Sequence, residues 1–218
     1  MEIKFYCPRW GSESIPWPVF SKRARLEGYR GIEVFPLLHL NEKELMLDSL
    51  EENDLEFALL HAELKEGKDF KKYLTALRDN LYILADYRKG NLLPSFISSQ
   101  TGREYYAPSQ VEECLGICDE IERDTGIPIY QETHRNKWSY AAHVVKEYLL
   151  RHPSLKLTLD LSHWVCVSES FLQDQQDAVD LAIQHAFHLH ARVGYPEGPQ
   201  VIDPGSPENA EALFHHLK

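Results

Sequence analysis

The sequence predicts an α/β fold, a (β/α)8 TIM barrel of which seven βα units are present in this chain. Apolar runs with strand character alternate with amphipathic segments of helical length along the 218 residues. The repeat of about thirty residues is close to the roughly 31 residues per unit of a barrel of about 250 residues. A doubly wound open sheet is less favoured, because the first strand is followed by Pro-Arg-Trp-Gly-Ser-Glu-Ser and not by a glycine-rich phosphate turn.

The strands and helices of this prediction follow one another in order. Strand-like runs begin near Ile3, Tyr29, Leu55, Leu92, Ile127, Leu155 and Ala186. Helical segments are expected at 20–27, 42–52, 70–88, 109–125, 140–151, 174–185 and 207–218. Asn41 is a candidate N-cap for the second helix and Gly126 a candidate C′ glycine for the fourth. The fifth helix ends before Pro153, which cannot continue a helix.

The prediction leaves the barrel one unit short. Residues 1–218 form a single domain in this interpretation, and an eighth strand would begin a few residues beyond Lys218. A barrel without one strand would expose two unpaired sheet edges. Truncation of a longer protein is the favoured explanation; the alternatives are another segment or partner in the gap, or an open sheet.

Composition narrows the class of protein. The hydrophobic content of 43% with 26% charged residues is typical of a soluble globular protein. A formal net charge of −11 argues against nucleic acid as the main partner. The N-terminus has no signal-peptide pattern, and no apolar run approaches the ~20 residues of a membrane span. The four cysteines lack disulfide-scaffold or CxxC spacing. We therefore expect a cytoplasmic protein with no membrane partner, and leave open whether it forms a homo-oligomer.

Polar side chains gather where the last three strands end. Residues 127–135 read Ile-Pro-Ile-Tyr-Gln-Glu-Thr-His-Arg, residues 155–163 read Leu-Lys-Leu-Thr-Leu-Asp-Leu-Ser-His, and residues 186–192 read Ala-Phe-His-Leu-His-Ala-Arg. Strand side chains alternate between two faces, so each strand has a polar front and an apolar back. The side chains expected on the polar fronts are Tyr130, Glu132 and His134, then Thr158 and Asp160, then His188, His190 and Arg192.

Three of these side chains have the spacing of a metal site. Glu132, Asp160 and His190 are separated by 28 and 30 residues, which is about one βα unit each. Consecutive strands would thus deliver two carboxylates and an imidazole to the same end of the sheet. This mixed oxygen and nitrogen set suits Mn²⁺, Mg²⁺, Co²⁺ or Zn²⁺. His163, three residues beyond Asp160, is a candidate further ligand or substrate contact.

Four motifs also carry a family resemblance. They are Gly-Tyr-Arg-Gly-Ile-Glu-Val-Phe at 28–35, the glutamate at 132, Asp-Leu-Ser-His at 160–163 and His-Leu-His-Ala-Arg at 188–192. With them the chain resembles the xylose isomerase-like TIM-barrel superfamily of sugar phosphate isomerases and epimerases, inosose dehydratases and, more remotely, endonuclease IV-type enzymes. The similarity in layout covers essentially the whole chain.

The resemblance implies a divalent-metal-dependent sugar isomerase or epimerase that transfers a proton through a metal-stabilised enediolate. Glu132, Asp160 and His190 match the first three metal ligands of ketose 3-epimerases, and the fourth, a glutamate, would lie on the eighth strand beyond Lys218. Glu132 would also be the base, and His163 would hold a substrate oxygen. The resemblance thus implies that one of the two acid/base glutamates would lie beyond Lys218.

The remaining candidates would line the substrate site. Arg192 and His134 are expected in the cup that the polar fronts of the last three strands form around Glu132, Asp160 and His190. There they would bind hydroxyl, carboxylate or phosphate groups of a sugar or sugar derivative. Glu33 ends the second strand and is a candidate substrate contact. His61 ends the third strand and is either a substrate contact or a structural residue. Two alternatives remain: a lyase or hydrolase on the same scaffold, dehydratase-like or endonuclease-like, and a non-catalytic barrel that serves as a binding module.

Overall fold

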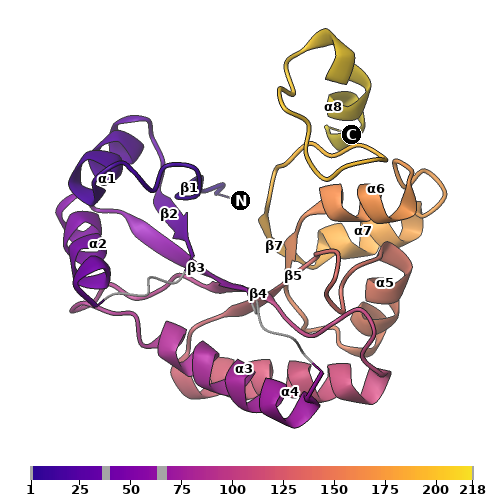
Figure 1. Ribbon diagram of the computed structural model, residues 1–218, viewed down its shortest axis with the longest axis horizontal. Helices are drawn as coiled ribbons and strands as arrows, with labels where there is room; N and C mark the ends of the chain where they lie inside the picture. Colours follow the sequence, from indigo (N-terminus) through magenta and orange to yellow (C-terminus); the bar gives the residue numbers. More distant parts are fainter. Residues whose placement is uncertain (1, 36–39, 63–67, 218) are drawn as a thin grey trace. The chain divides into compact units, whose positions relative to one another are not determined.

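The computed structural model describes residues 2–35, 40–62 and 68–217 (Figure 1). In these residues the strands run parallel in a seven-stranded sheet, in the order in which they occur along the chain. They are β1 (Tyr6–Pro8), β2 (Gly31–Val34), β3 (Glu56–Ala62), β4 (Ile97–Gln100), β5 (Ile129–Glu132), β6 (Leu157–Leu159) and β7 (Ala186–Leu189). The prediction of an α/β fold of the TIM-barrel type is confirmed.

Helices connect the strands, as the alternating pattern predicts, and residues 161–168, where no helix is expected, form a further one. They are α1 (Trp17–Leu26), α2 (Leu40–Glu52), α3 (Phe70–Ala85), α4 (Pro108–Thr125), α5 (Ala142–Arg151), α6 (Leu161–Ser168), α7 (Gln176–Gln184) and α8 (Ala210–His216), with a short 3-10 helix, η1 (Pro207–Asn209), before the last. Among the described residues, no helix is both long enough and apolar enough to cross a bilayer.

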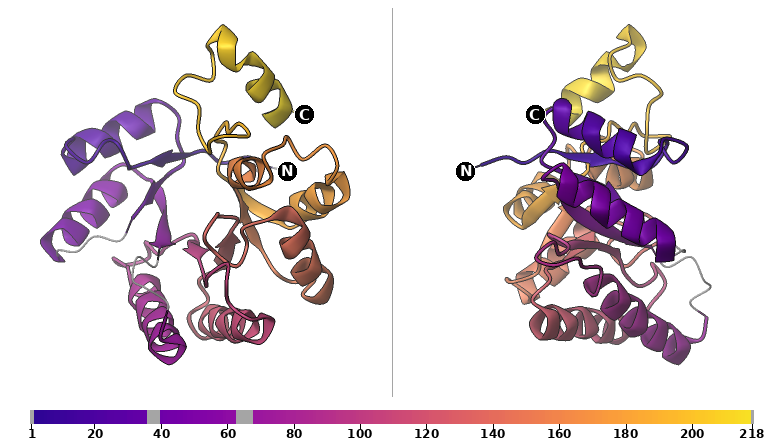
Figure 2. Two further views of the ribbon diagram at one scale, coloured as in Figure 1. Left: turned by 45° about the vertical axis from the view of Figure 1, so that its right-hand side comes forward. Right: turned by 90° about the vertical axis from the view of Figure 1, so that its left-hand side faces the viewer.

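The chain divides into two compact units. The first comprises Met1–Ser99 and Glu113–Ile129 and contains β1 to β3, most of β4, and α1 to α3. Helices α1 and α2 lie side by side in both views of Figure 2. Apolar side chains of β2 and β3, including Ile32, Phe57 and Leu59, are fully buried in this unit.

The second unit comprises Gln100–Glu112 and Tyr130–Lys218 and contains the end of β5, then β6, β7 and α5 to α8. Helices α5 and α7 pack against each other. Leu157, Leu159, Val145 and Ala182 are buried at 2% exposure or less, so the apolar face of β6 and the inner faces of these helices form a common core.

A separate small core holds the end of the second unit. Val193, Val201 and Ala212 are buried together, with Phe171 and Leu213 packed against them. The Gly194 backbone passes so close to α6 that a Cβ atom there would lie 2.8 Å from the Cβ atom of Ser162. Only glycine permits this approach without displacement.

Several element boundaries differ from the prediction. The fourth strand begins at Ile97, not near Leu92, because Leu92 forms an isolated antiparallel bridge with Lys89 and is followed by Pro94, which has no N–H for a sheet. The first strand begins at Tyr6, and Ile3 is 67% exposed. Asn41 lies inside α2 and is not its N-cap.

The sheet also departs from simple alternation along β7. The register shifts between Leu157, which faces Ala186, and Thr158, which faces His188, so Phe187 has no partner position on β6. The ring of Phe187 lies 5.7 Å from that of Tyr130, a side chain expected on the polar front. Phe187 and Leu189, the apolar back of this strand, are 60% and 61% exposed.

Candidate metal centre

Two carboxylates and an imidazole meet at the carboxyl ends of β5, β6 and β7 within the second unit. Glu132, Asp160 and His190 each offer a ligand atom, and these atoms lie within 4.8 Å of one another. His190 Nδ1 is 3.6 Å from Glu132 Oε1 and 4.0 Å from Asp160 Oδ2. Both carboxylates are buried, with 2% and 0% of their side chains exposed. The geometry agrees with the spacing argument from the sequence.

Asp160 is held by the helix that begins directly after it. It is the N-cap of α6, and its Oδ1 accepts a hydrogen bond from the backbone N–H of Ser162 at 3.0 Å and another from the Ser162 hydroxyl. The carboxylate thus lies at the positive end of the helix dipole. With Oδ1 fixed in this way, Oδ2 points towards His190 and Arg192.

Glu132 is the last residue of β5 and is fixed from several directions. The Gln100 amide donates to both of its carboxylate oxygens at 3.2 Å. The Ser139 hydroxyl donates to its carbonyl oxygen. The next residue, Thr133, exchanges hydrogen bonds of 2.7 and 2.9 Å with the backbone of Asp160. These contacts set the separation between the two carboxylates before any ligand binds.

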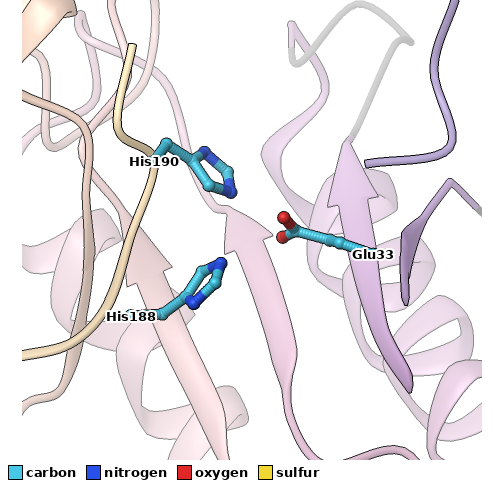
Figure 3. Close-up of side chains that lie close together, drawn as sticks. All are labelled: Glu33, His188 and His190. Carbon is cyan, nitrogen blue, oxygen red and sulfur yellow. The ribbon is translucent and has the colours of Figure 1, made fainter. Parts of the chain in front are cut away.

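His190 follows β7 and continues its pairing with β6, because its backbone N–H donates to the Leu159 carbonyl at 3.1 Å. The rings of His188 and His190 extend to the same side of this segment, as Figure 3 shows, with their centroids 5.3 Å apart. The expectation that these two histidines share a face is confirmed.

His163 lies beside the three candidate ligands on α6 and not in a turn after the strand, since β6 ends at Leu159 and the helix starts at Leu161. Its Nε2 is 2.6 Å from Arg192 Nη2 and 3.8 Å from Asp160 Oδ2. The ring of His134 is 3.9 Å from that of His163. His134 and Arg192 therefore lie in the predicted cup, and Arg192 also forms an ion pair with Asp160.

Burial and positive neighbours set the charge of this histidine. Burial, together with the nearby His134, Arg192, Arg135 and His190, lowers the pKa of His163 to about 2. The imidazole therefore stays neutral at physiological pH and can accept or donate a single hydrogen bond at each nitrogen. Burial also lowers the pKa of His134, while the charge of Glu132 opposes that shift.

The donor set fits a divalent cation. Two buried carboxylates so close together repel each other, and an ion between them and His190 would add to the positive charge that Arg192 already places beside Asp160. Carboxylate oxygens with one imidazole nitrogen are ligands that Mg²⁺, Mn²⁺, Co²⁺ and Zn²⁺ accept. Glu132, Asp160 and His190 would hold the ion, and Gln100 and Ser162 would orient the two carboxylates.

Two predicted substrate residues belong to the first unit. Glu33 extends from β2 and is 3% exposed (Figure 3). His61, on β3, is also 3% exposed, and its Nδ1 lies 2.9 Å from the Ser99 hydroxyl. This buried hydrogen bond is a structural contact, and substrate roles for Glu33 and His61 stay predictions.

The sequence interpretation missed two residues. Gln100 ends β4, and its amide donates to both carboxylate oxygens of Glu132. Arg135 follows His134 in the loop after β5, and its Nη1 lies 3.4 Å from His163 Nδ1. The position of Gln100, a polar residue at the end of the fourth strand, could have indicated that it contacts the site. Nothing in the sequence pattern indicated that the side chain of Arg135 points towards His163.

The fold and the site together define a class: a TIM-barrel-type protein with a metal-binding donor set at the carboxyl ends of its strands. No protein-family model matches the sequence, and no curated protein does so. Solved structures with the same fold are found, and the four described below are 11% to 20% identical to this chain.

Three of these structures illustrate the class. The probable 3-DHS dehydratase AsbF of Bacillus anthracis is 20% identical with a TM-score of 0.64, covering 95% of this chain and 78% of its own. A D-tagatose 3-epimerase-like protein is 14% identical with a TM-score of 0.63, covering 98% and 85%. A xylose isomerase-like TIM-barrel protein from Mycobacterium smegmatis, in complex with magnesium, is 11% identical with a TM-score of 0.58, covering 86% and 74%.

A family 2 AP endonuclease from Brucella melitensis shares the fold as well, at 15% identity and a TM-score of 0.56, covering 99% of this chain and 88% of its own. At these identities the likeness establishes the fold alone. It confirms the predicted xylose isomerase-like TIM-barrel fold, while the activities of these enzymes differ among themselves.

Proposed function

We propose that this protein is a divalent-metal-dependent enzyme that isomerises or epimerises a sugar or sugar derivative by proton transfer. The observation that carries the proposal is the meeting of Glu132, Asp160 and His190 within 4.8 Å at the carboxyl ends of three consecutive strands. In TIM barrels this end of the strands carries the chemistry. Epimerases among the solved structures with this fold support the choice of reaction.

The metal would polarise a carbonyl or hydroxyl oxygen of the substrate and so acidify the neighbouring C–H bond. Glu132 is the proposed base. One of its oxygens faces His190, and both accept from Gln100, which fixes the carboxylate plane for proton removal. The deep burial of Glu132 excludes bulk water from the carboxylate that receives the proton.

His163 is the proposed substrate-orienting residue. Its imidazole is neutral, and Arg192 donates to its Nε2, so the remaining proton lies on Nδ1 and points away from Arg192. That N–H would hold a substrate oxygen on the side of the ring that faces Arg135. Arg192 would fix the tautomer of His163 and balance the charge of Asp160.

The test is a proton-exchange assay on purified protein. Samples supplied in turn with Mg²⁺, Mn²⁺, Co²⁺ and Zn²⁺ would be incubated with a panel of ketoses, aldoses and polyols in D₂O, and followed by NMR. Deuterium uptake at the carbon next to the carbonyl, together with an isomeric product, supports the proposal. Loss of water from the substrate would instead indicate a dehydratase, the activity named for AsbF.

A protein that binds no divalent ion and exchanges no proton in this assay would contradict the proposal. Cleavage of DNA that contains an abasic site, in a parallel assay, would indicate the endonuclease alternative and would also contradict it.

A further inference from the structure

Beside the candidate ligands, two guanidinium groups face the two nitrogens of a single imidazole. Arg192 Nη2 is 2.6 Å from Nε2 of His163, and Arg135 Nη1 is 3.4 Å from Nδ1. Guanidinium groups only donate hydrogen bonds, whereas an imidazole has at most one acceptor nitrogen, so at least one of its nitrogens carries a proton that faces a guanidinium group. The shorter contact makes Nε2 the acceptor. The Nδ1–H group therefore points at Arg135, so that one donor faces another.

A second metal ion does not resolve this arrangement. Ligand atoms of Glu132, His134 and His163 also lie within 4.8 Å of one another, which is a metal-binding distance set on its own. However, one nitrogen of His163 accepts from Arg192 and the other faces Arg135. A cation bound there would lie against these guanidinium groups and be repelled by them.

An anionic oxygen would give both donors, the Nδ1–H group of His163 and the guanidinium group of Arg135, an acceptor. Such an oxygen accepts from the Nδ1–H group of His163 and from Arg135 at the same time, and its charge is opposite to that of the guanidinium groups. His163 is 1% exposed, whereas Arg135 is exposed, so an anion would enter from the Arg135 side.

The loop that carries Arg135 is also held in place. The Arg103 guanidinium donates to the Asn136 side-chain oxygen at 2.7 Å. Asn136 has a φ of 69°, a left-handed conformation that asparagine tolerates better than most residues. The His134 ring donates to the Arg135 carbonyl at 2.5 Å. These contacts hold the loop so that Arg135 faces His163. The positive charge at this place contrasts with the net charge of −11 of the whole chain.

We propose that Arg135 and the Nδ1–H group of His163 form an anion subsite that binds the carboxylate or phosphate group of an acidic sugar. The inference rests on the proposed function in that it places a sugar in this cup, and it narrows the substrate class to negatively charged sugars. Arg192 is a positioning residue here, because it fixes the tautomer of His163.

The test is a binding measurement that needs no metal and no turnover. Isothermal titration calorimetry on the full chain in EDTA would compare D-fructose, D-fructose 6-phosphate and D-fructuronate, which differ only in the group at carbon 6. The wild type should bind at least one of the two acids about tenfold or more tightly than fructose. Tighter binding of D-fructose 6-phosphate would indicate a phosphate subsite, and tighter binding of D-fructuronate a carboxylate subsite.

The variant Arg135→Gln should lose this preference. The matched control Arg151→Gln removes the same charge from an exposed arginine at the other end of α5, where it pairs with Glu112, and should keep the preference. Equal or undetectable binding of all three hexoses by the wild type, or a preference that survives in Arg135→Gln, would overturn the subsite. Failure of the metal and exchange assays with this preference intact would overturn only the proposed function.

Discussion

Two groups of hydrogen-bonded carboxylates, one in each unit, lie at opposite ends of the strands that carry them. In the first unit, Glu56 is the first residue of β3, and it accepts hydrogen bonds from Lys4 at 2.9 Å, Tyr6 at 2.6 Å and Arg30 at 2.8 Å. In the second unit, Glu132 ends β5 and Asp160 follows β6. Glu56 accepts hydrogen bonds from two cationic side chains, and both carboxylate oxygens of Glu132 accept from the amide of Gln100.

The difference separates a stabilising cluster from a ligand-binding one. Partial burial favours the neutral form of Glu56, but the hydrogen bonds from Lys4, Tyr6 and Arg30 outweigh it and lower its pKa to about 2. Its charge is thus already balanced within the fold. Around the other two carboxylates, Gln100 and Ser162 fix the orientation and Arg192 pairs with Asp160. Together with His190, Glu132 and Asp160 form a donor set suited to a cation.

The largest effect is expected from Glu132→Gln. The change keeps the size of the side chain but removes the proposed base and one anionic ligand. We expect turnover to fall by about a hundredfold or more. Thermal unfolding should change little. Turnover and metal content, the latter by elemental analysis, are the measurements.

Glu147→Gln is the matched control, since Glu147 is exposed on α5 in the same unit. Wild-type turnover in Glu132→Gln, measured with its metal supplied, would show that Glu132 is not the base and would place it with Glu56 as a structural carboxylate.

A smaller effect is expected from Gln100→Leu. Without the amide, both oxygens of Glu132 lose a hydrogen bond that sets the carboxylate plane. Metal affinity should fall by about ten- to a hundredfold, as measured by titration calorimetry with Mn²⁺. The control Gln173→Leu alters an exposed glutamine after α6 and should leave affinity unchanged. Unchanged affinity in Gln100→Leu would mean that the amide does not orient a ligand.

Gly194→Ala tests the close packing of Gly194 against Ser162, the residue that donates a hydrogen bond to Asp160. The new methyl group would lie 2.8 Å from the Cβ atom of Ser162, the residue that holds Asp160 Oδ1. Overpacking of this kind costs about 1–3 kcal/mol of unfolding free energy. Denaturant unfolding would measure it. Gly116→Ala, where a Cβ atom meets nothing within 4 Å, is the control, and equal stability of both variants would contradict the close approach.

The smallest effect is expected from Glu56→Gln, which should lower the free energy of unfolding by about 1–2 kcal/mol at neutral pH. Turnover should not change. Because the folded pKa of about 2 is below the ordinary 4.5, the contribution of Glu56 is complete above pH 4.5 and disappears as the pH falls towards 2. Denaturant unfolding of the wild type and the variant should therefore converge in that pH range.

Glu52→Gln, at an exposed position of α2, is the control for the loss of one negative charge. If the stability difference between Glu56→Gln and the wild type does not depend on pH between 4.5 and 2, then Glu56 does not stabilise the fold through its charge.

Much of the fold was predictable because alternation and helical spacing are local signals. Gly126, for example, ends α4 with a φ of 72°, as a C′ glycine should. The ends of helices and strands were less predictable where the same residues are compatible with two kinds of secondary structure. Leu92 and Leu93 look like a strand, but Pro94 prevents it, and Asp160 to His163 look like strand and turn although Asp160 is an N-cap.

The site was predictable to the extent that it depends on strand spacing. Glu132, Asp160 and His190 converge because each ends a consecutive βα unit. The register shift beside Phe187 depends on how β6 and β7 pair, which no single strand reveals. The contact of Arg135 with His163 depends on loop conformation, and loops carry no periodic signal.

The most direct test of the metal centre is anomalous diffraction from crystals grown with Mn²⁺. We predict one strong anomalous peak at roughly 2.0–2.3 Å from a carboxylate oxygen of Glu132, a carboxylate oxygen of Asp160 and a ring nitrogen of His190. Arg192 should then move away from Asp160 Oδ2. A fully loaded crystal without a peak at these three residues, or with a peak only elsewhere, would contradict the account.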